Sequence, residues 1–319
     1  MTLSRWSERC EHLPSFFESP PKNSRITNFP VLAFFPMRHV AVLLILALPA
    51  FCADTALTLE EKEEFLSTAK VASSRGAKKG IAMTVRAKLS DGNVKHDASI
   101  QRIEEEKPRF ETDKGTEINF RDSWQFNVAA YRLGRMLGLH DMIPPSVERP
   151  FEGRRGAWTW WIEDVTMDEI ERVKKGENDP DSDHWARQYQ IMKVFDQLIS
   201  NMDRNQQNML YDKHWRLWMI DHTRAFRVRT TVPDPKALQR CDQVLLERMK
   251  ALNKDNLTDC IGKYVRPREI KGLLARRDQI LATFEKLGPK AVYDYLPVRA
   301  EQDYRYISAV PKSSGRRGR

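Results

Sequence analysis

Three oxygen-bearing side chains have a spacing that suits phosphoryl transfer with a divalent metal ion. Asp203 is followed by Asn208 five residues later, and Asp221 comes thirteen residues after that. Phosphoryl transfer from ATP uses one Asp that orients the attacking hydroxyl, and an Asn and a second Asp that hold the metal. The spacing therefore predicts Asp203 as a catalytic residue and Asn208 and Asp221 as ligands of Mg²⁺ or Mn²⁺.

The segment between the two predicted metal ligands is expected to bring them together. Residues 209–211 and 215–220 are β-prone runs on either side of a polar break. This pattern predicts a β-hairpin, which would fold Asn208 back beside Asp221 so that two oxygen ligands meet one hard cation. Asp and Asn also occur in ordinary turns, so the prediction depends on the three residues and the hairpin together.

This part of the chain resembles the signature of the atypical kinase-like superfamily. That superfamily includes phosphatidylinositol 3- and 4-kinases, HipA-like toxin kinases and secretory-pathway casein kinases, and the stretch is also similar to a group of uncharacterised bacterial proteins. The resemblance is carried by Asn201-Met202-Asp203-Arg204 through Asn208 and by Ile220-Asp221-His222-Thr223-Arg224-Ala225-Phe226. It implies ATP as the bound nucleotide, and it implies that Arg204 braces the catalytic loop or neutralises phosphate.

Two positions depart from the pattern of these families. Asn205 stands where lipid kinases usually have His, and His222-Thr223 replaces the usual Phe-Gly after the metal-binding Asp. Both departures fall within the residues that carry the resemblance.

The resemblance implies an α+β, bilobal protein-kinase-like fold, with a small β-rich N-lobe over residues 54–165 and a mostly helical C-lobe over residues 166–305. The residue patterns agree, because strands come early and helices late. Residues 81–89 and 94–103 predict a hairpin around the turn at residues 90–93. Helical periodicity is found at residues 124–137, 184–199, 236–253 and 266–286, and residues 166–183 are predicted to be a surface connection.

Protein kinases pair a nucleotide-binding Lys with a Glu on the regulatory helix of the N-lobe. By the resemblance, the helix at residues 124–137 is that helix, and Asn127 stands where the Glu is usual. Lys107 is the candidate for the Lys, with Lys95 a poorer one. Glu163 and Val165 fall at the expected hinge between the lobes, where backbone groups would bind the adenine edge.

The N-terminal region contains the pattern of an export signal. Residues 37–53 combine a short basic start, an apolar run of about ten residues and a small-residue exit. We expect export to the periplasm or the medium, and no stable membrane span in the mature chain, because a span needs about twenty apolar residues. Residues 1–36 are interpreted as an extension upstream of a true start at Met37.

Charge and cysteine usage add little about partners. Much of the formal net charge of +9 lies in the segment before residue 54 and in the tail, residues 306–319, which is predicted to be basic and disordered. A nucleic-acid surface is therefore not expected. Cys241 and Cys260 either form a disulfide or remain as two buried thiols.

The leading hypothesis is an exported, ATP- and metal-dependent phosphotransferase. The alternative is a pseudokinase or nucleotide-binding module without transfer activity, which the neutral Asn127 and the missing Gly-rich phosphate loop favour. A metal-dependent hydrolase using Asp203, Asp221, His214 and His222 is a third reading that no tight ligand spacing supports. The acceptor of the phosphoryl group (protein, lipid or small molecule) is left open by the sequence.

Overall fold

The computed structural model describes residues 57–76, 84–112 and 115–296. The expected upstream extension, export signal and basic tail lie outside these ranges. The boundary expected at residue 165 between two lobes stays a prediction. Among the described residues, no helix has the length and apolar character needed to cross a bilayer.

The N-terminal half is built around an antiparallel sheet with the strand order β1-β2-β3-β7-β6. Its strands are β1 (Lys70–Gly76), β2 (Val85–Ser90), β3 (Lys95–Gln101), β6 (Ser146–Phe151) and β7 (Arg154–Trp160). The predicted turn between β2 and β3 is confirmed, because the Asp91 carboxylate accepts hydrogen bonds from the backbone N–H groups of Asn93 and Val94 at 2.8 and 2.7 Å. Helix α1 (Leu59–Thr68) covers the sheet and contributes Phe65 and Leu66 to a small core that includes Trp158.

A second hairpin, β4 (Glu104–Thr112) and β5 (Gly115–Ser123), lies between β3 and the next helix and was not predicted. It is fastened to the C-terminal part of the chain by ion pairs. Arg266 contacts Glu106 at 2.6 and 2.7 Å, Arg121 contacts Glu269 at 3.4 Å, and Arg227 contacts Glu117 at 2.6 Å. The hydrogen bonds from Arg266 lower the pKa of Glu106 to about 2.

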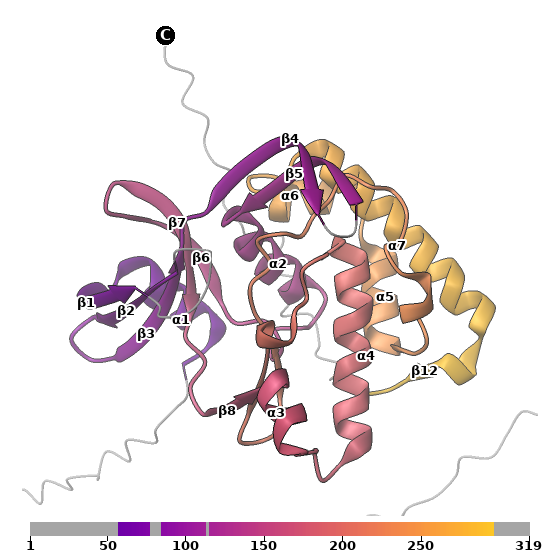
Figure 1. Ribbon diagram of the computed structural model, residues 1–319, viewed down its shortest axis with the longest axis horizontal. Coiled ribbons are helices and arrows are strands. Elements are labelled where there is room, and N and C mark those ends of the chain that lie inside the picture. The colour runs from indigo at the N-terminus through magenta and orange to yellow at the C-terminus, as the bar shows by residue number, and fades with distance from the viewer. Residues whose placement is uncertain (1–56, 77–83, 113–114, 297–319) are drawn as a thin grey trace, which may run out of the picture. The chain divides into compact units, whose positions relative to one another are not determined.

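The C-terminal half is mostly helical, and α2 lies between it and the sheet (Figure 1). Helix α2 packs against β6 and β7 on one side and against α6 on the other. The helices are α2 (Gln125–Met136), α3 (Glu169–Lys175), α4 (Ser182–Ile199), α5 (Gln243–Ala251), α6 (Lys254–Ile261) and α7 (Pro267–Leu287). The α+β arrangement predicted from the sequence, with strands early and helices late, is confirmed.

Two of the predicted elements were wrong in detail. Residues 166–183 are not only a surface connection: they hold most of β8 (Val165–Asp168), the whole of α3 and the start of α4. The signals for α3 are local, since the Asp168 carboxylate caps its start and Gly176 ends it at φ +68°. The helix expected from residue 236 begins at Gln243, after a short 3₁₀ turn (Pro235–Ala237) and strand β11 (Cys241–Asp242).

Cys241 and Cys260 are free and buried. Cys241 lies on β11, which pairs in parallel with β12 (Val292–Tyr293) after the 3₁₀ turn Pro289–Ala291, and Cys260 lies on α6. Burial raises the pKa of Cys241, and burial likewise raises the pKa of Cys260 to about 12. Of the two alternatives, the structure therefore has buried thiols, which are unreactive because so little thiolate forms.

Candidate active site

The predicted hairpin forms and places Asn208 beside the end of its second strand. Strand β9 (Met209–Asp212) pairs with β10 (Leu217–Met219), and the backbone N–H of Ile220 donates to the carbonyl of Asn208 at 3.1 Å. Asp221 is therefore the residue directly after the one that pairs with Asn208. The side chain of Asn205 caps the 3₁₀ turn Gln206–Asn208, which ends in Asn208 itself.

The two predicted metal ligands are partly constrained by their neighbours. The Asn208 amide nitrogen donates to the carbonyl of Asp203 at 3.4 Å, which leaves the amide oxygen for another partner. Asp221 adopts a φ of 54°, a conformation uncommon for any residue except Gly, and one carboxylate oxygen accepts from the Thr223 hydroxyl at 3.0 Å. A backbone held in such a conformation is typical of functional sites.

Arg204 is the centre of the hydrogen-bond network around the loop that contains Asp203. Its guanidinium donates to both carboxylate oxygens of Asp196 at 2.9 and 3.0 Å, and to the carbonyls of Asn208 and Ile220 at 3.1 and 2.7 Å. The fifth N–H contacts His222 Nε2 at 2.9 Å. An Arg side chain has five N–H donors, so none is left for a phosphate group. Of the two roles expected for Arg204, the contacts favour bracing the loop.

Helix α4 ends at Ile199, and its capping residue Ser200 immediately precedes the loop that contains Asp203. Ser200 is fully buried at φ 51°, and its hydroxyl has no hydrogen-bond partner among the described residues. A left-handed conformation costs an L-residue about 1–2 kcal/mol, and Gly is the usual residue there. We expect Ser200→Gly to raise the free energy of unfolding by about 1 kcal/mol, measured by thermal unfolding.

A matched substitution in an ordinary helix provides the control for Ser200. Ser67 lies in the last turn of α1, exposed to solvent, and Ser67→Gly should lower the melting temperature, because Gly is a poor helix former. If both variants lose stability alike, the conformation of Ser200 is not strained.

The ring of His222 is buried against Arg204 and the helix α4. Burial, with a smaller effect of the Arg204 charge, holds the pKa of His222 well below its usual value of 6.5. The neutral ring accepts from Arg204, whereas an unfolded His would take up a proton below about pH 6.5. The free energy of unfolding should therefore fall as the pH drops from about 6.5 toward the lower pKa of the folded protein.

Chemical denaturation at a series of pH values between 7.5 and 5 measures that loss. His222→Gln removes the titrating ring and should show a flatter decline than the wild type. His214→Gln, which replaces an exposed ring, should keep the wild-type slope. Equal slopes for the wild type and His222→Gln would contradict the assignment.

Asp203 is accessible to solvent, with 43% of its side chain exposed. One oxygen lies 3.4 Å from the guanidinium of Arg224, which is also 4.0 Å from Asp122 on β5. Burial raises the pKa of Asp122, and the charge of Asp221 adds to the effect. Asp203, Asp221 and Asp122 thus lie in one neighbourhood, and Arg224 partly offsets their charge.

The predicted pair of Lys107 and Asn127 is not formed. Lys107 lies on β4 and contacts Glu105 at 2.6 Å. Asn127 is on α2, where its amide nitrogen donates to Gln101 at 2.6 Å and its oxygen accepts from the backbone N–H of His222 at 2.7 Å. Lys107 lies within β4, and the strand that directly precedes the helix is β5, which the sequence pattern does not reveal.

Glu163 lies on the connection between β7 of the five-stranded sheet and β8, and Val165 is the first residue of β8. Strand β8 belongs to a second sheet, β10-β9-β8, which contains the hairpin between the two predicted metal ligands. Glu163 contacts His96 at 3.2 Å with most of its side chain exposed, and Val165 begins β8 opposite Asp212. The residues thus lie between the two sheets, and both the hinge and its contact with an adenine ring stay predictions.

Several residues of this site escaped the sequence-based reasoning. Gln101 is the partner of Asn127, and Asp196 is the partner of Arg204. The sequence between each residue and its partner contains no pattern that predicts the contact. Arg224 is part of the matched motif without having been given a role. No cluster of three His, Cys, Asp or Glu side chains suited to a metal ion occurs in the described part of the chain.

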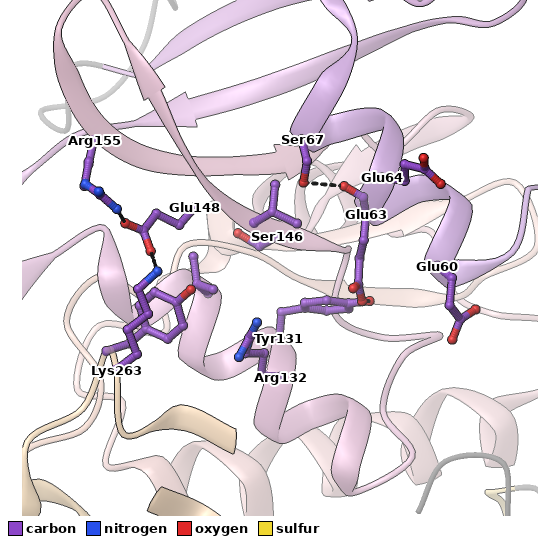
Figure 2. A pocket seen from close by; sticks show the side chains of 13 residues that line it. Glu60, Glu63, Glu64, Ser67, Tyr131, Arg132, Ser146, Glu148, Arg155 and Lys263 are labelled. Atoms are coloured by element: carbon purple, nitrogen blue, oxygen red, sulfur yellow. Dashed lines mark hydrogen bonds and ion pairs between the residues drawn. The ribbon is translucent and has the colours of Figure 1, made fainter. Parts of the chain in front are cut away.

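A cavity of about 460 Å³ lies away from these residues, between α1, α2, β6 and the turn after α6. Figure 2 shows Glu148 reaching Arg155 on one side and Lys263 on the other. Burial alone would raise the pKa of Glu148, but hydrogen bonds from Lys263 and Arg155 outweigh it and lower the pKa. No residue predicted for the active site lines this cavity.

The comparisons with known proteins establish the fold. No family model matches the chain, and no curated protein matches it in sequence. A structure of hydra Fam20 with sugar matches at a TM-score of 0.54 and 14% identity, covering 76% of this chain and 93% of that one. This likeness shows that the predicted kinase-like fold is present.

Two further kinase structures were found at lower similarity. The proinflammatory kinase CtkA of Helicobacter pylori matches at a TM-score of 0.41 and 9% identity, covering 70% of this chain and 95% of that one. A MAP kinase from Leishmania major matches at a TM-score of 0.28 and 11% identity, covering 79% of this chain and 96% of that one.

Proposed function

We propose that the protein is an exported, atypical kinase-like phosphotransferase that uses ATP and a divalent metal ion. The observation that carries the proposal is the hydrogen bond between Ile220 N–H and Asn208 carbonyl, which sets Asp221 next to Asn208 at the end of the hairpin. An amide oxygen and a carboxylate are hard donors, so this pair fits Mg²⁺ or Mn²⁺.

The residues divide the work of phosphoryl transfer as follows. Asn208 and Asp221 would hold the metal ion, which would neutralise negative charge on the phosphates. Asp203 has an exposed carboxylate that accepts the proton of the acceptor hydroxyl and orients it for attack. Arg204 keeps both segments in register, because it bonds to the carbonyls of Asn208 and Ile220 at once.

A second candidate is a nucleotide-binding module without transfer activity. The observation that favours it is the contact of Asn127 with Gln101, since two neutral amides stand where kinases have a charged pair. A neutral pair holds phosphates less strongly than a Lys does. Both functions include nucleotide binding, so an assay of phosphate transfer is needed to distinguish them.

Calorimetry with ATP, in Mn²⁺ and in EDTA, tests the shared part of the two proposals. We expect ATP to bind only with the metal ion. Release of labelled γ-phosphate, or its transfer to the protein itself, then selects the phosphotransferase, and binding without turnover selects the module. Absence of ATP binding in Mn²⁺ would refute both functions.

A further inference from the structure

Two buried hydrogen bonds link the N-terminal sheet to the residue after Asp221. Gln101 ends β3, and its side-chain oxygen accepts from the amide nitrogen of Asn127 at 2.6 Å. The Asn127 oxygen accepts from the backbone N–H of His222 at 2.7 Å. Gln101, Asn127 and His222 are 8%, 5% and 2% exposed, so all three residues are buried.

The position of these two hydrogen bonds in the fold can be compared with that of the Lys–Glu pair of protein kinases. In protein kinases the third strand of the sheet carries a Lys, in a pattern written V-A-I-K, that pairs with a Glu on the following helix. Strand β3 here ends with Ala98-Ser99-Ile100-Gln101, and α2 provides Asn127. Gln101 therefore stands where the Lys is usual, and neither Lys107 nor Lys95 does.

The chemistry of amides explains how the substitution works. An Asn side chain has both donors and acceptors, so Asn127 receives one hydrogen bond from His222 and donates another to Gln101. A buried ion pair must overcome the cost of removing two charges from water, whereas an amide pair does not. The neutral pair can therefore fix α2 and the His222 backbone whether or not a nucleotide is present.

The backbone around Gln101 is packed closely enough to hold it in place. Gln101 pairs with Ala157 on β7, and a Cβ atom at Gly156 would lie only 2.7 Å from the Gln101 carbonyl oxygen. The neighbouring strand can approach this point because Gly156 has no side chain. The sheet therefore holds the backbone of Gln101 in place, and α2 holds that of Asn127.

We propose that Gln101 and Asn127 are positioning residues, which occupy the nucleotide-facing place of the kinase Lys–Glu pair and set the loop of Asp221 through the backbone of His222. The part of this proposal that concerns the nucleotide rests on the proposed function. The part that concerns the loop does not, because it is a statement about the hydrogen bond to His222.

Hydrogen exchange tests the loop without any ligand. Asn127→Ala removes the acceptor of the His222 N–H, and we expect exchange of that amide to accelerate by roughly tenfold or more. Asn127→Asp keeps an acceptor in the same place, and Gln101 can turn its amide to donate, so protection should largely return. Equal exchange in Asn127→Ala and the wild type would overturn the positioning role.

A charge swap tests the nucleotide-facing place. Gln101→Lys and Asn127→Glu each bury one charge without its partner, and each should lower the melting temperature. The double variant rebuilds a Lys–Glu pair and should regain stability. By placing a Lys beside the phosphates it should also bind Mn²⁺–ATP roughly tenfold more tightly than the wild type. Gln243→Lys, on the exposed face of α5, should leave both values unchanged.

The results separate this proposal from the function it extends. A wild type that binds no Mn²⁺–ATP refutes the proposed function, while the exchange measurement still decides the role of Asn127. A wild type that binds Mn²⁺–ATP, with a stable double variant that binds it no better, places positions 101 and 127 away from the phosphates and overturns the nucleotide-facing assignment.

Discussion

Asp221→Ala should abolish metal-dependent ATP binding, whereas Asp203→Ala should retain it and lose phosphate transfer. Asp221 is one of two predicted metal ligands, so its removal leaves only the Asn208 amide. The Asp203 carboxylate pairs with Arg224, and only its backbone carbonyl contacts a predicted ligand, the amide of Asn208. Loss of a residue that orients and deprotonates the acceptor lowers turnover by about 10²–10⁴-fold.

Calorimetry with Mn²⁺–ATP and a γ-phosphate assay on the same preparations distinguish the two variants. Asp259→Ala, an exposed carboxylate on α6, is the matched control and should behave as the wild type in both measurements. Normal Mn²⁺–ATP binding by Asp221→Ala would remove it from the metal site. Normal turnover by Asp203→Ala would mean that another group activates the acceptor.

Arg204→Met should cost about 3–5 kcal/mol of folding free energy, the largest stability effect expected for this site. The Arg204 and Asp196 side chains are 9% and 7% exposed, so the substitution leaves a carboxylate buried without its cation. It also deprives the carbonyls of Asn208 and Ile220 of a donor. Urea unfolding measures the difference, and loss of the hairpin register should remove metal binding as well.

Two further variants define what the Arg204 measurement means. Adding Asp196→Leu to Arg204→Met should restore much of the lost stability, since the unpaired charge is then gone. Lys213→Met breaks the ion pair with Asp164, in which both side chains are more than half exposed, and should cost less than about 1 kcal/mol. Comparable losses in Arg204→Met and Lys213→Met would show that Arg204 does not brace the loop.

The part of the site that could be predicted from the sequence is local. The spacing of Asp203, Asn208 and Asp221 and the apolar strands between them determine a hairpin, because strand alternation and a polar turn act over a few residues. The order of strands and helices likewise followed from periodicity. These features need no knowledge of distant contacts.

What escaped prediction depends on residues far apart in the chain. The β4–β5 hairpin is rich in charged residues and has few buried positions, so its pattern does not indicate a core-facing strand. The hairpin is held in place by ion pairs with Arg266 and Glu269, roughly 150 residues later in the chain. Gln101 was missed for a different reason, since an uncharged residue does not suggest a phosphate site until its contact with Asn127 is known.

The ion pairs of the β4–β5 hairpin have a consequence for how a nucleotide enters and leaves. Closure by rotating one half of a protein about a hinge requires that the halves be free to separate. Here ion pairs of Glu106, Arg121 and Glu117 connect the β4–β5 hairpin to the C-terminal part of the chain. Exchange of nucleotide should therefore proceed through small shifts of individual loops, and high salt, which screens the exposed Glu106–Arg266 contact, should quicken it.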